Sequence, residues 1–181
     1  MPSLYYDIFE TPEGWMGALA STKGLKKTTL PALTPDFCAE QLQPDLSIAA
    51  ESPERFRNLR LTIIMFLAGN KVDFSKEHLD FGASTPFLRA VWEACTTIPN
   101  GQTRSYKWLA SEAGYPNASR AAGQAMARNR LPIVIPCHRV IRSDGSLGGY
   151  GSGQNQLRLK RRLLAIEASP TTSEQPKADP G

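Results

Sequence analysis

The segment from residue 132 to residue 142 reads Pro-Ile-Val-Ile-Pro-Cys-His-Arg-Val-Ile-Arg. The apolar run 133–135 predicts a strand, and Pro136, which has no N–H to offer a neighbouring strand, predicts where it ends. Cys137 follows directly, with His138 and two arginines close behind. Since the thiolate is the reactive form of cysteine and nearby cations favour it, the segment indicates a nucleophilic Cys137. A buried structural cysteine at the end of a strand is the alternative.

Charge is distributed unevenly along the 181 residues, which carry a net charge of +4. Residues 1–81 contain 8 Lys and Arg against 11 Asp and Glu, whereas residues 82–168 contain 12 against 4, a net charge of +8. Basic surfaces bind phosphates with release of counterions, so the second half is expected to bind nucleic acid. The alternative is a basic face that only aids solubility.

Local patterns predict most helices and turns. Residues 4–30 are expected to form a hairpin or small sheet, residues 31–52 an irregular Pro-rich segment, and residues 53–68 a helix closed by a glycine. Thr85 and Pro86 predict the start of another helix, with Cys95 on its buried face. Residues 143–145 predict a chain reversal, and residues 155–168 a last helix.

Between the helix that starts at Pro86 and the last helix, the sequence predicts two short helices with the layout of a helix-turn-helix unit. Ser105 caps the first, Gly114 ends it, and the second covers about residues 118–127. The second helix consists almost entirely of small residues. Alanine-rich helices form readily and pack closely on a neighbour, but small side chains also allow a helix to enter a narrow groove. Both interpretations are compatible with the residues alone.

Matches to a known family extend well beyond the cysteine segment. They are, in chain order, Thr85-Pro86-Phe87, Val91-Trp92, Ile98-Pro99, Ser105-Tyr106, Leu109-Ala110, Arg120-Ala121, Met126, Asn129, Pro132, Pro136-Cys137-His138-Arg139-Val140-Ile141, Gly149-Tyr150 and Leu163-Leu164-Ala165 with Glu167. This series resembles the C-terminal domain of the O6-alkylguanine–DNA alkyltransferases, which move an alkyl group from DNA to a cysteine of their own. The resemblance covers about residues 82 to 168.

The resemblance implies an α/β (α+β) fold. Residues 1–81 would form a small N-terminal support domain with a sheet and a helix. Residues 82–168 would form a winged helix-turn-helix-like domain that binds DNA and carries the active-site cysteine. Residues 169–181, rich in Pro, Ser and Thr, are expected to be a disordered tail.

The implied reaction is irreversible, single-turnover transfer of an alkyl group, typically methyl, from O6-alkylguanine in double-stranded DNA to Cys137. O4-alkylthymine would be a further substrate. His138 would serve as the base and Glu167 would orient it, as nucleophilic catalysis requires. Tyr106 would donate its hydroxyl to a guanine ring nitrogen, and Asn129 would tie the second short helix to the active-site turn.

The same resemblance implies how the DNA would be held. The helix 118–127 would enter the minor groove, where readout is degenerate, and Arg120 would fill the gap left by the flipped base. The other residues on this DNA-binding surface would be Ala118, Ser119, Ala121, Ala122 and Arg128. The alkylguanine pocket would comprise Met126, Pro132, Val140, Tyr150 and Gly151, with the Val140 carbonyl accepting from the exocyclic amine of guanine.

The sequence lacks features that are typical of several other classes of protein. The 3 separated cysteines fit neither a disulfide framework nor a zinc site, so no metal and no cofactor are expected. No apolar run approaches the ~20 residues needed to span a bilayer, and no secretory signal is visible. The chain is expected to act as a monomer on double-stranded DNA, without membrane contact. Its expected location is the cytoplasm, in association with the nucleoid, or the nucleus.

Three other functions are alternatives to this hypothesis. A lesion binder of the alkyltransferase-like type lacks the cysteine, which is present here as Cys137. A regulator would carry an extra metal-binding module, for which the sequence shows no residues. A cysteine hydrolase commonly needs a distant histidine, and His78, the one other histidine, lies outside the matching region.

Overall fold

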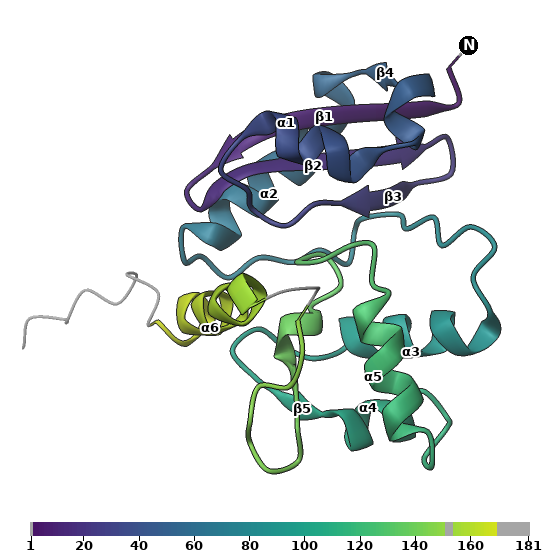
Figure 1. Cartoon of the computed structure of the whole chain (residues 1–181), viewed down its shortest axis with the longest axis vertical. Coiled ribbons are helices and arrows are strands. Elements are labelled where there is room, and N and C mark those ends of the chain that lie inside the picture. Colours follow the sequence, from purple (N-terminus) through teal and green to yellow (C-terminus); the bar gives the residue numbers. More distant parts are fainter. Residues whose placement is uncertain (1, 151–153, 170–181) are drawn as a thin grey trace, which may run out of the picture.

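The computed structural model describes residues 2–150 and 154–169 (Figure 1). The first half contains a four-stranded sheet with the strand order β3-β2-β1-β4. β1 (Leu4–Thr11) and β2 (Gly14–Ser21) form an antiparallel hairpin, β3 (Leu25–Thr28) pairs with β2, and β4 (Ala50–Glu51) runs parallel to β1. The predicted small sheet is therefore confirmed.

Two helices pack against this sheet. α2 (Arg57–Leu67) follows the 3-10 turn η2 (Pro53–Phe56), which confirms the predicted helix, and its buried side chains join the core. The expectation of an irregular segment over 31–52 is wrong, because α1 (Pro35–Leu42) and the 3-10 turn η1 (Asp45–Ile48) lie within it. Thr34 caps α1 by accepting from the Phe37 N–H at 3.3 Å, and Pro35 starts the helix.

The second half is mostly helical (Figure 1). Its elements are α3 (Pro86–Thr96), β5 (Arg104–Ser105), α4 (Tyr106–Glu112), α5 (Ser119–Ala127), the 3-10 turn η3 (Cys137–Arg139), β6 (Val140–Ile141) and α6 (Gln154–Ala168). The hydroxyls of Thr85 and Ser105 cap α3 and α4, as predicted. α4 and α5 contact each other, which confirms the helix-turn-helix layout.

The strand predicted over 133–135 is wrong. Residues 133 and 134 form a turn, with Ile133 at φ 75°, and Cys137 begins η3 instead of following a strand. The apolar side chains are buried as expected, but their backbone is satisfied locally, since the Ile135 N–H donates to the Leu131 carbonyl at 2.8 Å. Burial therefore does not require a strand at this point.

The sheet of the first half braces the chain upstream of the active-site segment. On β3, the Thr28 N–H donates to the Arg130 carbonyl at 2.9 Å, and the Thr28 hydroxyl donates to the Pro132 carbonyl at 3.0 Å. A continuous hydrophobic core contains residues of both halves. Among the described residues, no helix has the length and apolar character to cross a bilayer.

Candidate active site

Cys137 lies at the start of η3, with 7% of its surface exposed. Its Sγ accepts a hydrogen bond from Asn129 Nδ2 at 3.1 Å. Burial raises the pKa of the thiol, while the Asn129 bond and the positive charge of Lys160 act in the opposite direction. The thiol is thus protonated at neutral pH, and a base must remove its proton before it can react.

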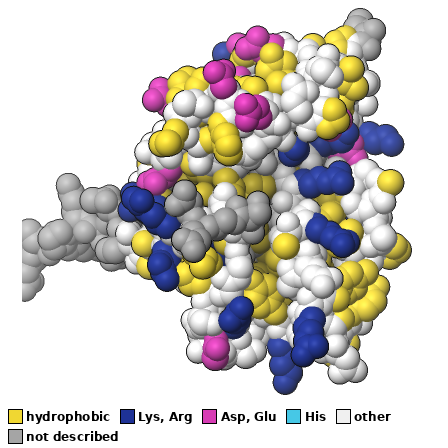
Figure 2. Space-filling model, in the orientation of Figure 1, with side chains coloured by type: hydrophobic (Ala, Val, Ile, Leu, Met, Phe, Trp, Pro, Cys, Tyr) yellow, Lys and Arg dark blue, Asp and Glu magenta, His cyan; other side chains and the backbone are white. Residues whose placement is uncertain are grey.

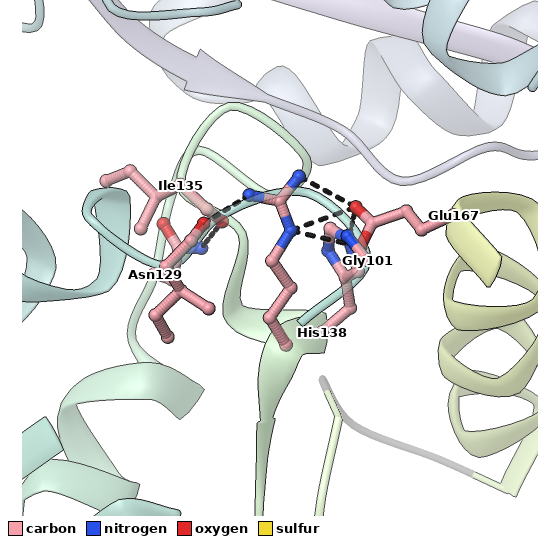
Figure 3. A network of polar contacts seen from close by, with 7 residues as sticks. Gly101, Asn129, Ile135, His138 and Glu167 are labelled. Atoms are coloured by element: carbon pink, nitrogen blue, oxygen red, sulfur yellow. Dashed lines mark hydrogen bonds and ion pairs between the residues drawn. The ribbon is translucent and has the colours of Figure 1, made fainter. Parts of the chain in front are cut away.

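Asn129 ties the end of α5 to the active-site turn, as predicted. Its Nδ2 also donates to the Ile135 carbonyl at 3.0 Å (Figure 3). Its Oδ1 accepts from the Leu131 N–H at 2.9 Å. These contacts fix the amide orientation, because the oxygen accepts and the nitrogen donates. The Cys137 sulfur is consequently held at a set distance from the helix.

His138 is completely buried, and its Nε2 lies 2.8 Å from Glu167 Oε1. Burial lowers the pKa of the imidazole, against the raising effect of Glu167, so the ring is neutral at pH 7. A neutral ring that donates through Nε2 carries a lone pair on Nδ1. Nδ1 is buried and forms no hydrogen bond with the residues that the structure describes. It is the nitrogen able to accept a proton.

Glu167 is the centre of a buried polar network (Figure 3). Besides His138, it accepts from Arg139 Nε at 2.9 Å, from Arg139 Nη2 at 2.7 Å and from the Gly101 N–H at 3.1 Å. Arg139 Nη1 donates to the Ile98 carbonyl at 2.6 Å. Although burial favours the neutral acid, the hydrogen bonds from His138 and Arg139 prevail and lower the pKa of Glu167 to about 2. The carboxylate stays ionised throughout the physiological range.

A cavity of about 700 Å³ opens in front of Cys137. That volume lies in the range of small-molecule sites, roughly 300–1,000 Å³. Its lining comprises Tyr106, Lys107, Ser119, Arg120, Gly123, Gln124, Met126, Ala127, Cys137, Arg142, Ser143, Gly148, Gly149 and Tyr150. Close backbone approach matters at Gly148, where a Cβ would lie 3.0 Å from the Tyr106 hydroxyl and where φ is +68°. Residues of α4, α5 and the 142–150 segment thus meet around the thiol.

The structure brings most, but not all, of the expected pocket residues together. Met126 and Tyr150 line the cavity, whereas Pro132 does not and bonds to β3 instead. Val140 is fully buried behind the cavity, and its carbonyl accepts from Lys160 Nζ at 2.6 Å. Gly151 lies outside the described residues. The pocket roles expected of Pro132 and Val140 therefore stay predictions.

The residues expected to bind DNA differ in exposure along α5. Arg120 and Arg128 are exposed, Ser119 and Arg120 reach the cavity, and Ala118 and Ala121 are half-buried. Ala122 is completely buried, so its side chain faces the core and the expectation of a DNA contact there is wrong. Figure 2 shows Lys and Arg side chains over the middle and lower parts of the face in view, while Asp and Glu gather mainly at the top.

Two site residues escaped the sequence-based interpretation. The sequence indicates Arg139 only as a cation near the thiol, yet it pairs with Glu167. Lys160 belongs to no motif of the sequence, yet it is completely buried beside the site. The helical spacing of Lys160, Leu163 and Glu167, all on the buried face of α6, is the signal that could have identified it. The described residues contain no group of three or more potential metal ligands of the His, Cys, Asp or Glu type.

Comparisons with known proteins agree with one another. The family model of the 6-O-methylguanine DNA methyltransferase DNA-binding domain matches residues 86–169. The chain is 38% identical over 165 residues to a methylated-DNA–protein-cysteine methyltransferase of Methanosarcina barkeri, covering 91% of this chain and 97% of that protein. A protein of the same name from Methanothermobacter thermautotrophicus is 46% identical over 115 residues, which is 64% of this chain and 62% of that protein.

Solved structures give the same result over nearly the whole chain. O6-methylguanine methyltransferase of Mycobacterium tuberculosis superposes with a TM-score of 0.75 at 31% identity, covering 93% of this chain and 96% of that one. The Mycobacterium tuberculosis OGT structure in complex with DNA gives a TM-score of 0.73 at 32% identity, with 91% and 92% covered. The arrangement of both halves is thus shared with these proteins.

Proposed function

The chain belongs to the methylated-DNA–protein-cysteine methyltransferase family, a family of DNA-repair proteins that act by alkyl transfer, and we propose that Cys137 is its alkyl acceptor. The observation that best supports this proposal is the buried Cys137 thiol at the cavity, with the neutral base His138 and its ionised partner Glu167 behind it. The substrate would be O6-alkylguanine in double-stranded DNA, with O4-alkylthymine as a second substrate.

The transfer is an in-line displacement at the alkyl carbon. The Cys137 sulfur forms a bond to that carbon while the bond from carbon to guanine O6 breaks, and the electron pair stays on the base. The thiol proton passes through a water molecule to Nδ1 of His138 and finally to the guanine, which leaves neutral. Tyr106, with a pKa raised by burial, stays protonated and can donate to a ring nitrogen as negative charge develops.

The base must leave the duplex to reach this buried sulfur. Flipping costs a few kcal/mol, which contacts in the groove must offset. The small residues on α5 support close approach of this helix to the minor groove, and the exposed Arg120 at the cavity supports a role in filling the vacated stack. A relative of known structure binds DNA, which supports DNA as the partner of this chain as well.

The proposal includes an assignment of roles to the two halves. Residues 1–81 would support the active-site turn through β3, and residues 82–168 would bind the lesion. One molecule would repair one lesion as a monomer, in the nucleoid-associated cytoplasm or the nucleus, where its substrate lies.

Mass spectrometry tests the proposed function directly. The protein is incubated with a duplex containing one O6-methylguanine, and the peptide holding Cys137 is weighed. A gain of one methyl group on this peptide is expected, with repaired guanine never exceeding protein on a molar basis. Cys137→Ser should bind the duplex without gaining mass. Binding by the native chain without a mass gain would instead identify a lesion binder, and product in excess of protein would contradict the single-turnover step.

A further inference from the structure

Lys160 of α6 is completely buried, and its ammonium is surrounded by backbone carbonyls. Its Nζ donates to Val140 and Leu147 at 2.6 Å each and to Gly149 at 3.2 Å. An ammonium has three N–H donors, so these bonds account for all of them. Val140 follows the active-site turn, and Leu147 and Gly149 precede Tyr150. One side chain thus connects β6, which follows the active-site turn, to the wall of the cavity.

Such a buried cation is costly unless an anion is close by. Lys160 forms no ion pair among the residues that the structure describes. The titratable groups that face it come from every neighbouring element: the thiols of Cys95 on α3 and Cys137 on η3, the neutral imidazole of His138, and the rings of Tyr106 and Tyr150, each 5.9 Å from Nζ.

Only one of these neighbours becomes an anion during the reaction. Burial raises the pKa of Cys95, Tyr106 and Tyr150, so these three stay neutral in the working range. The Cys137 thiol, in contrast, must lose its proton in order to attack. Burial lowers the pKa of Lys160 to about 8, and the two thiols act against this decrease. Lys160 and the Cys137 thiolate therefore stabilise each other's charged forms.

We propose that Lys160 is a positioning residue whose buried ammonium is the counter-charge of the Cys137 thiolate and fixes the wall of the guanine cavity. The proposal rests on the alkyl-transfer function inferred above. It also explains the burial of the Val140 carbonyl, which accepts from Lys160. After transfer the sulfur is a neutral thioether, so Lys160 loses its counter-charge in the spent protein.

Lys160→Met tests the charge while keeping an unbranched side chain of similar length. The rate at which iodoacetamide modifies Cys137, followed on its peptide across a pH series, reports the thiol pKa. We expect this pKa to rise by about one unit, so that Cys137 reacts roughly tenfold more slowly at neutral pH than in the native chain. The matched control is Lys71→Met, an exposed lysine of the first half, which should leave the profile unchanged.

The pH profile of alkyl transfer separates this role from simple structural support. Transfer from the free base O6-methylguanine should be about tenfold slower in folded Lys160→Met at neutral pH, and the difference should shrink as pH rises and the thiol ionises in both proteins. A ratio that is the same at every pH, or a thiol pKa equal to that of the native chain, would overturn the proposal.

A measurement on the native chain covers the case in which the variant does not fold. Lys160 is titrated by NMR in protein labelled at lysine, first with the free thiol and then with Cys137 blocked by methyl methanethiosulfonate, which leaves no ionisable sulfur. The blocked protein should lose its Lys160 proton at a pH lower by roughly half a unit. Identical titrations would refute the pairing. Neither this experiment nor the iodoacetamide assay needs DNA, so failure of the proposed function would be seen separately, as absence of methyl gain from a duplex.

Discussion

Glu167→Gln removes one negative charge from the buried network and keeps the side chain's size. Three donor groups converge on the carboxylate, from His138, Arg139 and Gly101, at 2.7 to 3.1 Å. The amide of Gln has one oxygen, and its NH₂ would face a donor, so at least one hydrogen bond is lost. Arg139, which is 8% exposed, would also lack its counter-ion.

The structure gives the magnitude of this loss. The pKa of Glu167 falls from 4.5 to about 2 in the fold, and one pH unit corresponds to about 1.4 kcal/mol. Ionised Glu167 therefore adds about 3 kcal/mol to the free energy of unfolding at neutral pH. In a protein of 181 residues, loss of this free energy should lower the melting temperature of Glu167→Gln by roughly 6–12 °C relative to the native chain. Because the folded pKa is the lower one, the contribution is complete above pH 4.5 and is lost as pH falls toward 2.

The effect on transfer follows from the tautomer of His138. Without the carboxylate, Nε2–H is no longer held, so the ring can change its tautomer and the lone pair on Nδ1 that accepts the thiol proton in the proposed mechanism is no longer fixed. A positioned base contributes roughly 10²–10⁴-fold to a rate, so single-turnover transfer should slow by at least about a hundredfold. Affinity for unmodified duplex should stay within a few-fold, because the network lies behind the cavity and away from the exposed side of α5.

Three measurements check this prediction: thermal unfolding from pH 7 down to pH 2, single-turnover transfer, and duplex binding. Glu93→Gln, at an exposed carboxylate on α3, is the matched control and should change none of them. The melting difference between Glu167→Gln and the native chain should vanish near pH 2. Equal losses of transfer and duplex binding, or a melting change without a transfer change, would show that the network serves only the fold.

Three further substitutions follow from the DNA-facing side of the site. Arg120→Ala should slow repair in a duplex far more than transfer from the free base, because only a duplex requires a side chain that fills the vacated stack. Arg120→Lys should restore little of the duplex repair, since lysine has no planar group. Full rescue by lysine would mean that Arg120 is only a phosphate contact. Ala121→Trp should fold and lose duplex binding, whereas Ala122→Trp should fail to fold because Ala122 is fully buried. Duplex binding is measured at a fixed salt concentration. A folded Ala121→Trp protein that binds the duplex normally would contradict groove entry at this position. Tyr106→Phe should slow transfer from the duplex and the free base by the same factor, measured under single-turnover conditions, since the hydroxyl acts on the base itself; a loss confined to the duplex would assign Tyr106 to DNA binding instead.

The parts of the fold that the sequence predicted correctly depend on short-range physics. The Thr85 and Ser105 caps each involve an N–H three residues ahead, and the buried face of α2 follows from helical spacing. The helix α1, which the sequence analysis does not predict, obeys the same rule at Thr34 and Pro35, so the sequence contains its signal among the prolines. These features need no knowledge of distant residues.

The features that could not be predicted depend on distant partners. The run 133–135 is apolar enough for a strand, but Asn129 and Thr28 supply the hydrogen bonds that turn the chain instead. Arg139 meets Glu167 across 28 residues, and Lys160 meets Val140 across 20. Among the expected site residues, Cys137, Asn129 and the pair of His138 with Glu167 come together as the resemblance implies, because a family pattern records such long-range contacts.

The roles of Arg139 and Lys160 explain how a carboxylate can assist a site that must form an anion. The carboxylate of Glu167 acts to raise the pKa of His138, and a protonated ring would have no lone pair to accept a proton. Burial is the main cause of the lowered pKa of His138, and the Arg139 guanidinium, which pairs with Glu167, acts in the same direction, so the ring keeps its base form while the carboxylate still fixes its tautomer. Lys160, the other buried cation near the site, favours the thiolate through its positive charge and donates to backbone carbonyls instead of the carboxylate. The two cations thus have separate tasks, and exchanging their charges for neutral groups should affect base strength at one and thiol ionisation at the other.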